Sequence, residues 1–518
     1  MSSAAQTVAP SRGVILGICV IAASTFIVLA SYNYMLPSML ADLDLTSEQG
    51  GLALKVPSLA SLLVVFVAGR VGDQLGHRKV ILFAGIFFII GCLVVAIAQN
   101  LTMVSIGMFI EGVAATAIQI VAIGLLAARF VEPKARAAAF ATYGMAYPAV
   151  YLIFPVLAGW LTTYMTWRAI PLIWALGGVV LLITARALLP TASPRPIGEL
   201  WTPILAGLFA VGIVQFLSHA SDYGVTSWQA LASAGLIVAS LVACIVLLRR
   251  LPSPSLSITP LKNGATTIIL AVVILVPTLN TFFFVTIALQ YQYGNTAFVT
   301  ALLMMPAQLA AMLGAKYLSE KFTDWVGVKR AGIILLLALA CVMAIPLTFS
   351  GTTPMWWVLF YVCAYGAVVT GVGVVVLNAL MSSAPAEEGG NTAAYQGSAE
   401  EVGIALGVVL MGALVFGVGT ASLQARLEES GLPPDQAAVV IADLQANSGS
   451  PEIAADYSYP LPDGSDATDV QKEAIADGLS VNGAAGIVIS LVAAGLFAIH
   501  RRQAGDDPAA YEEESSSA

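Results

Sequence analysis

The sequence predicts an all-α integral membrane protein whose fourteen transmembrane helices are arranged as six, two and six. The first observation is composition, because 58% of the 518 residues are hydrophobic and only 10% are charged, whereas soluble domains carry about 25% charged residues. The second observation is that apolar runs of about 20 residues, long enough to cross a bilayer as a helix, recur along the chain. The third is a short polar connector that occurs twice.

Fourteen apolar runs account for the predicted spans. They cover approximately 13–36, 50–69, 80–99, 102–127, 138–162, 168–189, 203–220, 228–248, 266–289, 296–318, 330–349, 354–380, 394–420 and 481–500. The first run is longer than the core of a signal peptide, so it counts as a span of the mature chain. All five cysteines fall inside apolar runs without ligand spacing, which predicts neither a disulfide framework nor a metal site.

Lysine and arginine are unevenly distributed between the two sides of the predicted bundle. If the N-terminus is cytoplasmic, eighteen of the 22 Lys and Arg residues fall on cytoplasmic connectors or span ends. The sequence therefore predicts a multi-pass protein of the cell membrane with both termini in the cytoplasm and the lipid bilayer as its surroundings. The net charge of −8 gives no indication of nucleic-acid binding.

The repeated connector has the pattern Asp-x-x-Gly-x-cation-cation. Its residues are Gly69, Asp73, Gly76, Arg78 and Lys79 in the first copy and Asp324, Gly327, Lys329 and Arg330 in the second. Eight spans separate the copies, whereas two six-helix halves would place six between them, so two further helices are inserted in the middle. The predicted regions are an N-terminal cytoplasmic tail (1–12), an N-terminal six-helix bundle (13–190), an inserted helix pair with linkers (191–265), a C-terminal six-helix bundle (266–502) and a disordered acidic tail (503–518).

The connector 421–480 within the C-terminal bundle is much longer than the others. It carries eleven acidic residues against Arg426 and Lys472, and the predicted topology places it outside the cytoplasm. Residues Pro434–Asn447 could form a short amphipathic helix, but a solvated acidic flap is the favoured interpretation.

The first connector resembles the loop motif G-x-L-A-D-R-x-G-R-[RK] of the major facilitator superfamily, with Gly72, Gln74 and His77 as departures. The fourteen spans with a central pair are similar to the drug:proton antiporter branch of that superfamily. The segment 33–37 matches the N-x-x-L-P signature of this branch. The segment 155–161 resembles its motif G-P-x-x-G-G-x-L. The resemblance covers nearly the whole chain. It implies a major facilitator fold and a monomeric alternating-access transporter of small molecules, without cofactor or enzymatic activity.

The connector and the proline motif have mechanistic interpretations within this resemblance. Asp73 can accept hydrogen bonds from the backbone of a neighbouring helix and pair with a cation, which would hold the two halves together on the cytoplasmic side. The alternative is an anchor for topology and stability. Pro155 and Gly159 permit a bend and close helix contact between the halves, or a kink without function.

Lys55, Glu111, Glu400 and Glu401 fall well inside predicted spans, away from their ends, where an unpaired charge costs ~3 kcal/mol or more. Glu111, Glu400 and Glu401 are candidates for proton coupling, because a carboxyl group in a low-dielectric cavity can bind and release a proton as access alternates. Adjacent helical residues point about 100° apart, so one of the two adjacent glutamates at most is expected to face the cavity squarely. Lys55 is a candidate buried partner of Glu111, in a functional pair or in a fixed ion pair that orients two helices.

Two polar residues expected from the antiporter branch are absent. The acid of its first helix corresponds to Val28, and the arginine of its fourth helix corresponds to Met108. These departures bear on proton coupling, so an uncoupled mechanism remains an alternative.

Uncharged polar and aromatic residues of the helices that should line the central path are candidates for the substrate cavity. They are Tyr32, Asn33, Gln119, Asn280, Gln290, Tyr361, Tyr365 and Asn378. A mostly apolar pocket with few polar groups suits a hydrophobic or amphipathic solute. The chain has no G-x-x-x-x-G-K-[ST] motif for nucleotide binding, which argues against ATP-driven transport.

The sequence therefore predicts a multidrug-type efflux transporter, proton-coupled and working by alternating access. One alternative is an exporter of lipids or cell-envelope metabolites, for which proton coupling is not required. A second, of a different class, is a membrane sensor or scaffold that transports nothing and uses the acidic connector 421–480.

Overall fold

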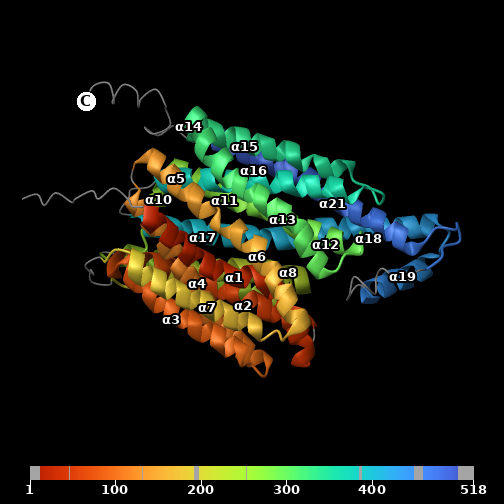
Figure 1. The fold of residues 1–518 in the computed structure, drawn as a ribbon, viewed down its shortest axis with the longest axis horizontal. Coiled ribbons are helices and arrows are strands. Elements are labelled where there is room, and N and C mark those ends of the chain that lie inside the picture. Colours follow the sequence, from red (N-terminus) through yellow and green to blue (C-terminus); the bar gives the residue numbers. More distant parts are fainter. Residues whose placement is uncertain are drawn as a thin grey trace, which may run out of the picture.

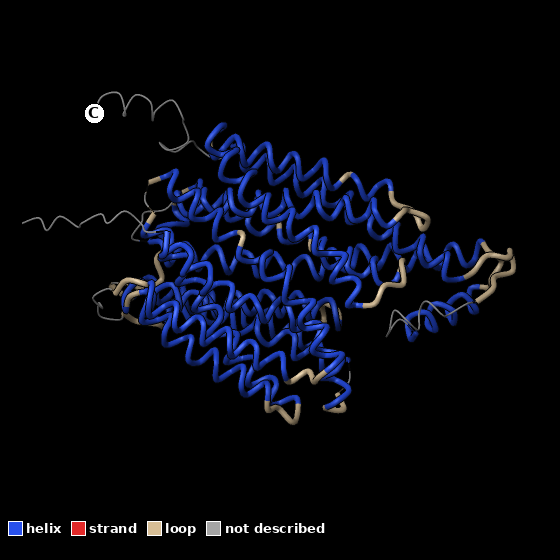
Figure 2. Tube along the Cα trace, in the orientation of Figure 1, coloured by secondary structure: helices blue, strands red, loops and turns tan. Residues whose placement is uncertain are grey.

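The computed structural model describes residues 12–45, 47–130, 132–191, 198–252, 254–383, 388–447 and 459–499. The predicted N-terminal tail lies outside these residues except for Arg12, and the predicted acidic tail lies outside them entirely. The described residues form an elongated α-helical bundle (Figures 1 and 2). Their one β-type pairing is an isolated bridge between Pro460 and Asp466.

The first half of the bundle contains seven helical elements, of which α1, α2, α3, α4 and α7 lie in the lower part of Figure 1. The seven elements are α1 (Arg12–Asp42), α2 (Ser47–Leu75), α3 (His77–Ala96), α4 (Leu101–Arg129), α5 (Pro133–Gly144), α6 (Ala146–Tyr164) and α7 (Ala169–Leu188). Polar residues at the helix starts define several boundaries. For example, the Asn100 side chain accepts a 2.9 Å hydrogen bond from the backbone N–H of Met103 and caps α4.

The inserted pair and the second half complete the bundle. Their elements are α8 (Trp201–Tyr223), α9 (Trp228–Arg250), α10 (Thr259–Lys262), α11 (Gly264–Leu275), η1 (Pro277–Leu279), α12 (Thr281–Tyr291), α13 (Ala297–Leu313), η2 (Gly314–Lys321), α14 (Phe322–Val326), α15 (Val328–Met343), η3 (Ile345–Thr348), α16 (Met355–Ser383), α17 (Gly389–Leu406), η5 (Gly407–Met411), α18 (Gly412–Glu429), α19 (Pro434–Asn447) and α21 (Ala467–Ile499).

The prediction of fourteen transmembrane helices is confirmed, because fourteen helices among the described residues are long and apolar enough to cross a membrane. Some spans consist of consecutive elements joined at a local irregularity. One span joins α11 to α12 through Pro277 and Asn280, which has a left-handed backbone with φ 45°. Another joins α17 to α18 through the π-helical turn η5. These two irregularities meet, since a Cβ on Gly407 would lie 2.7 Å from the carbonyl oxygen of Thr278.

The two copies of the polar connector have nearly the same backbone. Gly76 has φ 90° and ψ 131°, and Gly327 has φ 83° and ψ 155°. Each glycine ends one helix and begins the next, with a conformation that residues bearing a Cβ rarely adopt. We call the end of the bundle that carries these two turns the turn end, and the opposite end, where α19 lies, the α19 end (Figure 1).

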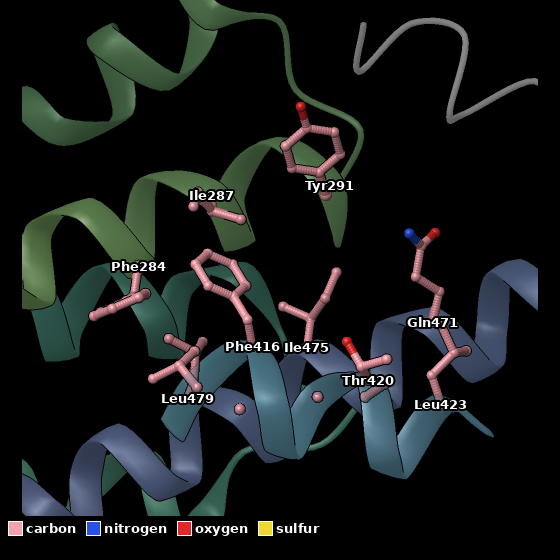
Figure 3. A pocket seen from close by; sticks show the side chains of 13 residues that line it. Phe284, Ile287, Tyr291, Phe416, Thr420, Leu423, Gln471, Ile475 and Leu479 are labelled. Atoms are coloured by element: carbon pink, nitrogen blue, oxygen red, sulfur yellow. The ribbon is translucent and has the colours of Figure 1, made fainter. Parts of the chain in front are cut away.

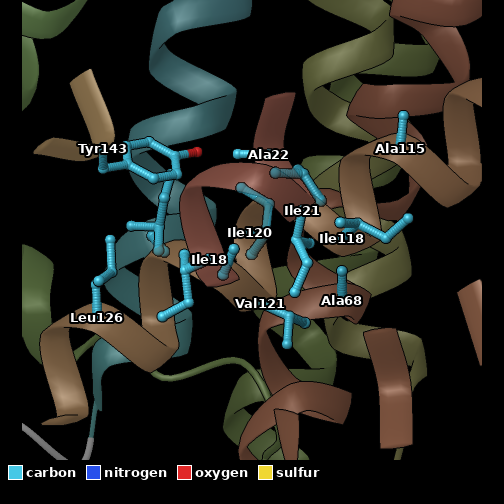
Figure 4. Close-up of a cluster of buried hydrophobic side chains, with 14 of the residues drawn as sticks. Ile18, Ile21, Ala22, Ala68, Ala115, Ile118, Ile120, Val121, Leu126 and Tyr143 are labelled. Atoms are coloured by element: carbon cyan, nitrogen blue, oxygen red, sulfur yellow. The ribbon is translucent and has the colours of Figure 1, made fainter. Parts of the chain in front are cut away.

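The core of the first half is packed with aliphatic side chains. Ile18 and Ile21 of α1 are fully buried and lie beside Ile118 and Ile120 of α4 (Figure 4). Tyr143 of α5 lies at one side of this cluster. This packing fixes the position of α1 relative to α4. Both helices line the cavity described below.

The long connector 421–480 differs from the favoured prediction of a solvated flap. Residues Pro434–Asn447 form the helix α19, and both neighbouring spans extend toward it as helices. A separate apolar cluster holds this part together, with Leu427 of α18, Val440 and Leu444 of α19 and Val470 of α21 among its buried members. The alternative of an amphipathic helix is therefore the correct one, because α19 buries one apolar face against the two extended spans.

Candidate functional site

A cavity of about 460 Å³ lies between the two halves of the bundle. Its walls come from α1, α2, α4, α5 and α6 on one side and from α11, α16 and α17 on the other. Its volume falls within the range of small-molecule sites, about 300–1,000 Å³. We call it the central cavity.

A smaller cavity of about 260 Å³, lined mainly by the first half, adjoins the central cavity. The two share six lining residues, which are Leu29, Ser61, Thr116, Gln119, Tyr151 and Glu401. Glu111 lines the smaller cavity only, Glu400 the central cavity only, and Glu401 both. All three predicted proton-coupling candidates therefore lie in one connected region.

The two adjacent glutamates of α17 have different partners. Gln396 donates a 2.6 Å hydrogen bond to Glu400 Oε2 within the same helix. Ser61 of α2 donates a 3.4 Å hydrogen bond to Glu401 Oε1 across the two halves. Both residues line the central cavity, and Glu401 at the same time contacts a neighbouring helix, α2, through Ser61.

Glu111 and Lys55 lie in different surroundings. Glu111 is 2% exposed on α4, where a Cβ on Gly91 of α3 would approach its backbone N to 2.6 Å. Lys55 is exposed and donates a 2.9 Å hydrogen bond to Ser218 of α8. Within the described part of the chain the predicted pair between Lys55 and Glu111 is not formed. Sequence position gave the depth of the two charges but not the direction in which their side chains point.

Tyrosines of α5 and α6 form one aromatic wall of the central cavity. Tyr147 and Tyr151 stack with ring centroids 4.4 Å apart, and Phe26 of α1 meets Tyr147 edge to face at 5.3 Å. Tyr143 lies one helical turn before Tyr147 on the same wall. The sequence interpretation missed these tyrosines, although their spacing of four residues places them on one helix face.

Some of the predicted cavity residues line a cavity, and others do not. Tyr32 and Gln119 line the cavities, and Gln119 donates a 3.1 Å hydrogen bond to Thr25 Oγ1. Tyr361 and Tyr365 are buried in the apolar core of the second half, where Tyr365 meets Phe282 edge to face. Their assignment to the cavity is wrong in this structure.

The remaining predicted cavity residues lie elsewhere. Asn280, Gln290 and Asn378 do not line either cavity. Asn280 occupies the break before α12, and Asn378 is 5% exposed within α16. The side chain of Asn33 lies outside the described residues.

The predicted gate motif lies at a direct contact between the two halves. A Cβ on Gly390 of α17 would lie 2.6 Å from the carbonyl oxygen of Gly69 on α2, and it would also collide with the carboxylate of Asp73. Asp73 thus sits at the N-terminus of α17, where the helix dipole favours a negative charge. His77 lies 3.8 Å from the same carboxylate, and Arg78 donates a 2.7 Å hydrogen bond to the carbonyl of Arg186.

The second copy of the motif has the same turn but a different environment. Asp324 and Arg330 of the second copy are exposed, and so is Lys79 of the first copy. Lys329 is partly buried. The interface at Gly390 is therefore made by the first copy, whereas the second copy keeps the turn geometry at Gly327.

Pro155 and Gly159 lie in α6 at another contact between the halves. Pro155 is buried, and a Cβ on Gly159 would lie 3.3 Å from the ring of Phe298 on α13. The small residue thus allows α6 and α13 to approach closely, in agreement with the geometry that the motif suggests.

A third cavity, of about 330 Å³, lies in the second half toward the α19 end (Figure 3). Phe284 and Tyr291 of α12, Phe416 of α18 and Leu479 of α21 surround it, and Gln471 lies at its edge. It contains no carboxylate and no residue from the first half. We therefore take the central cavity as the candidate functional site. No group of His, Cys, Asp and Glu residues suited to a metal ion occurs within the described ranges.

Comparison with known proteins gives matches over most of the chain. A sequence family described as Major Facilitator Superfamily matches residues 16–408. The puromycin resistance protein pur8 of Streptomyces alboniger is 25% identical over 430 residues, which cover 80% of this chain and 84% of that protein. The multidrug resistance protein Stp of Mycobacterium tuberculosis is 23% identical over 417 residues, which cover 78% of this chain and 76% of that protein.

A third relative and two solved structures extend these matches. The uncharacterized MFS-type transporter Rv1877 of Mycobacterium tuberculosis is 30% identical over 216 residues, which cover 40% of this chain and only 30% of that protein's length. The human organic anion transporter MFSD10 has a TM-score of 0.61 at 11% identity, with 94% of this chain and 99% of that chain covered. The proton:xylose symporter XylE has a TM-score of 0.58 at 12% identity, with coverage of 92% and 93%. These two structures confirm the predicted fold.

Proposed function

The chain belongs to the major facilitator superfamily, and we propose that it exports hydrophobic or amphipathic compounds across the cell membrane by proton-driven alternating access. It is a multi-pass membrane protein of a transporter family, not an enzyme. The observation that carries the proposal is that Glu111 and Glu401 line one cavity, with Glu111 on the first half and Glu401 on the second. Relatives named as puromycin and multidrug resistance proteins support the choice of substrate.

Alternating access requires the two halves to rock about the central cavity. The contact between Gly69 and Gly390 closes the turn end, so this contact must separate when that end opens. The Lys and Arg bias supports an orientation in which the turn end and both termini face the cytoplasm. In this orientation the structure has its cytoplasmic side closed. A single chain contains both halves and the complete cavity, so the monomer is the proposed working unit.

Protons enter this scheme through the cavity carboxylates. A carboxyl group that faces the outside can take up a proton, and the same group can release it after the cavity has turned toward the cytoplasm. The hydrogen bond from Ser61 supports this role for Glu401, because it joins the two halves. A change in the charge of Glu401 would therefore act on the interface that must move.

Transport in proteoliposomes tests the proposal. We expect ethidium to move against its gradient when a pH gradient is imposed, and Glu401→Gln or Glu111→Gln to abolish this movement while ethidium binding persists. Asp435→Asn on exposed α19 removes one acid at a distance and should transport normally. If the double variant Glu111→Gln, Glu401→Gln pumped as well as the wild type, the assignment of coupling would be wrong.

A second candidate function is export of lipids or cell-envelope metabolites. The apolar cavity between α12, α18 and α21 favours it, because Phe416 is 49% exposed in a membrane-spanning helix and could meet an acyl chain (Figure 3). Transfer of a fluorescent phospholipid between vesicle leaflets, without movement of ethidium, would support this function over drug export.

A further inference from the structure

The linker that precedes the inserted helix pair is attached to the first half at the turn end. The backbone N–H of Gly198, shortly before α8, donates a 3.1 Å hydrogen bond to Oε1 of Gln74 at the end of α2. Gln74 is 8% exposed and occupies the connector position at which the family motif has an arginine. An arginine side chain has no acceptor atom. This departure from the motif therefore supplies the acceptor that holds the first linker in place.

The linker that follows the inserted pair is attached to the second half. Ser257 donates a 2.8 Å hydrogen bond to Glu388 Oε1 at the start of α17. The Tyr395 hydroxyl of the same helix donates to the backbone carbonyl of Ser257 at 3.1 Å. Glu388 and Tyr395 lie on either side of Gly390 in the sequence, and Gly390 is the residue that closes against Gly69 of α2. The second linker is thus held where the two halves meet.

Glu199 joins the two linkers to each other. Its Oε1 accepts a 2.7 Å hydrogen bond from the N–H of Ser255, and its Oε2 accepts one of 3.0 Å from the N–H of Thr202. The Thr202 hydroxyl donates to the same carboxylate and accepts a 3.1 Å hydrogen bond from the N–H of Leu256. Thr202, Ser255 and Leu256 are at most 5% exposed, so this junction is shielded from water.

These contacts make a path of hydrogen bonds from the first half to the second that lies outside the cavities. The path consists of Gln74, Gly198, Glu199, residues 255–257 and Glu388. The inserted pair is also packed on the first half, because a Cβ on Gly207 of α8 would lie 2.6 Å from the carbonyl oxygen of Leu63 on α2. Separation of the halves at the turn end must therefore break one link of the path.

We propose that the inserted pair and its linkers act as a strap that holds the turn end closed, anchored to the first half at Gln74 and to the second half at Glu388, with Glu199 as the junction between them. The strap acts in parallel with the contact between Gly69 and Gly390. Contacts that exist only in the closed state shift the equilibrium toward that state. The strap requires the motion that the proposed function also requires, but it depends on no particular substrate or coupling ion.

Distances between the two halves test the strap. Spin labels are attached at Phe83→Cys of α3 and Ile334→Cys of α15, since Phe83 and Ile334 are 66% and 44% exposed, after the five native cysteines have been replaced by alanine. The full chain is measured in nanodiscs at neutral pH, without ethidium and without a pH gradient. Ser257→Ala should raise the ratio of molecules open at the turn end to closed molecules by about tenfold, equivalent to about 1.4 kcal/mol, because it removes a hydrogen bond to a carboxylate.

Two further substitutions separate the strap from a general loosening of the inserted pair. Ser240→Ala removes another buried hydroxyl, which donates to carbonyl groups of its own helix α9, and it should leave the distances unchanged. Glu199→Gln weakens the junction and should open the turn end as Ser257→Ala does. Because the two links lie in series, the double variant Glu199→Gln, Ser257→Ala should open no further than the more open of the single variants.

Unchanged distances in Ser257→Ala would overturn the strap, and this result does not require Glu199→Gln to fold. Additive opening in the double variant would also overturn it, since the two links would then be independent contacts. The shift without any proton-driven movement of ethidium would leave the strap standing and remove the proposed function. Normal ethidium transport with unchanged distances in all variants would do the reverse.

Discussion

Ser61 of α2 and Glu401 of α17 face each other across the two halves, with Ser61 Oγ donating a 3.4 Å hydrogen bond to Glu401 Oε1. Both residues line the central and the smaller cavity. The interface between the halves therefore contains a carboxylate whose partner belongs to the opposite half. A contact of this kind can link the occupancy of the cavity to the separation of the halves.

Replacing the hydroxyl donor tests this link. We expect Ser61→Ala to lower the rate of pH-gradient-driven transport by at most about fivefold, the factor that corresponds to a hydrogen bond of ~1 kcal/mol. Thr116→Val is the matched control, because Thr116 also lines both cavities but donates to the carbonyl of Gly112 in its own helix. An equal loss in both variants would assign the effect to cavity polarity instead of the contact between halves.

The contact at the turn end can be tested with two adjacent glycines. A Cβ on Gly390 would lie 2.6 Å from the Gly69 carbonyl oxygen, whereas a Cβ on Gly389 would have its nearest neighbours at 3.6 Å. Gly390→Ala should therefore disfavour closure of the turn end by about tenfold or more, since overpacking costs ~1–3 kcal/mol. Gly389→Ala should leave closure nearly unchanged.

Distances between spin labels on α3 and α15 at the turn end measure this closure. A shift toward longer distances in Gly390→Ala alone is the expected result. The same distance distribution in both variants would show that Gly69 and Gly390 do not limit closure.

Glu199 gives a prediction on pH, because it joins the two linkers of the inserted helix pair. Partial burial by itself raises its pKa, but hydrogen bonds from the Thr202 hydroxyl and from the backbone N–H groups of Ser255, Thr202 and Trp201 outweigh burial and lower the pKa. The N–H of Ser255 lies 2.7 Å from Glu199 Oε1. The carboxylate therefore stabilises the fold above the pKa of an unfolded glutamate, about 4.3. This contribution is lost as the pH falls through the lower pKa of the folded state.

Thermal unfolding of the wild type and Glu199→Gln between pH 7 and pH 3 measures the effect. The variant should unfold at a lower temperature at pH 7, and the difference should shrink as the pH falls below about 4.3. A difference that stays constant over this range would mean that the charge of Glu199 contributes nothing.

The spans and the two turns were predictable because each depends on local sequence. An apolar run of sufficient length must form a helix in the bilayer, since its backbone groups have no other hydrogen-bond partners there. The turns depend on Gly76 and Gly327, which adopt backbone angles that other residues avoid. The fold could therefore be predicted down to the individual span.

The direction in which side chains point could not be predicted in the same way. The helix α16 is apolar on all sides, so nothing in its sequence distinguished Tyr361 in the packed core from a residue lining the cavity. Likewise, the sequence positions of Lys55 and Glu111 are compatible with an ion pair, but the two side chains face different surroundings. Orientation around a helix axis depends on packing between distant segments, which a single sequence does not reveal.

The apolar cluster at the α19 end gives the last prediction. Leu427 of α18 is fully buried against Val440 and Leu444 of α19, whereas Val439 is 59% exposed. Replacing a buried leucine with alanine costs about 2–5 kcal/mol. Leu427→Ala should therefore raise amide hydrogen exchange in α19 by about thirtyfold or more. Val439→Ala should leave the exchange nearly unchanged, because Val439 buries little surface. Ethidium binding should persist in both variants, because this cluster is separate from the walls of the central cavity. Unchanged amide hydrogen exchange in Leu427→Ala would show that other contacts hold α19 in place.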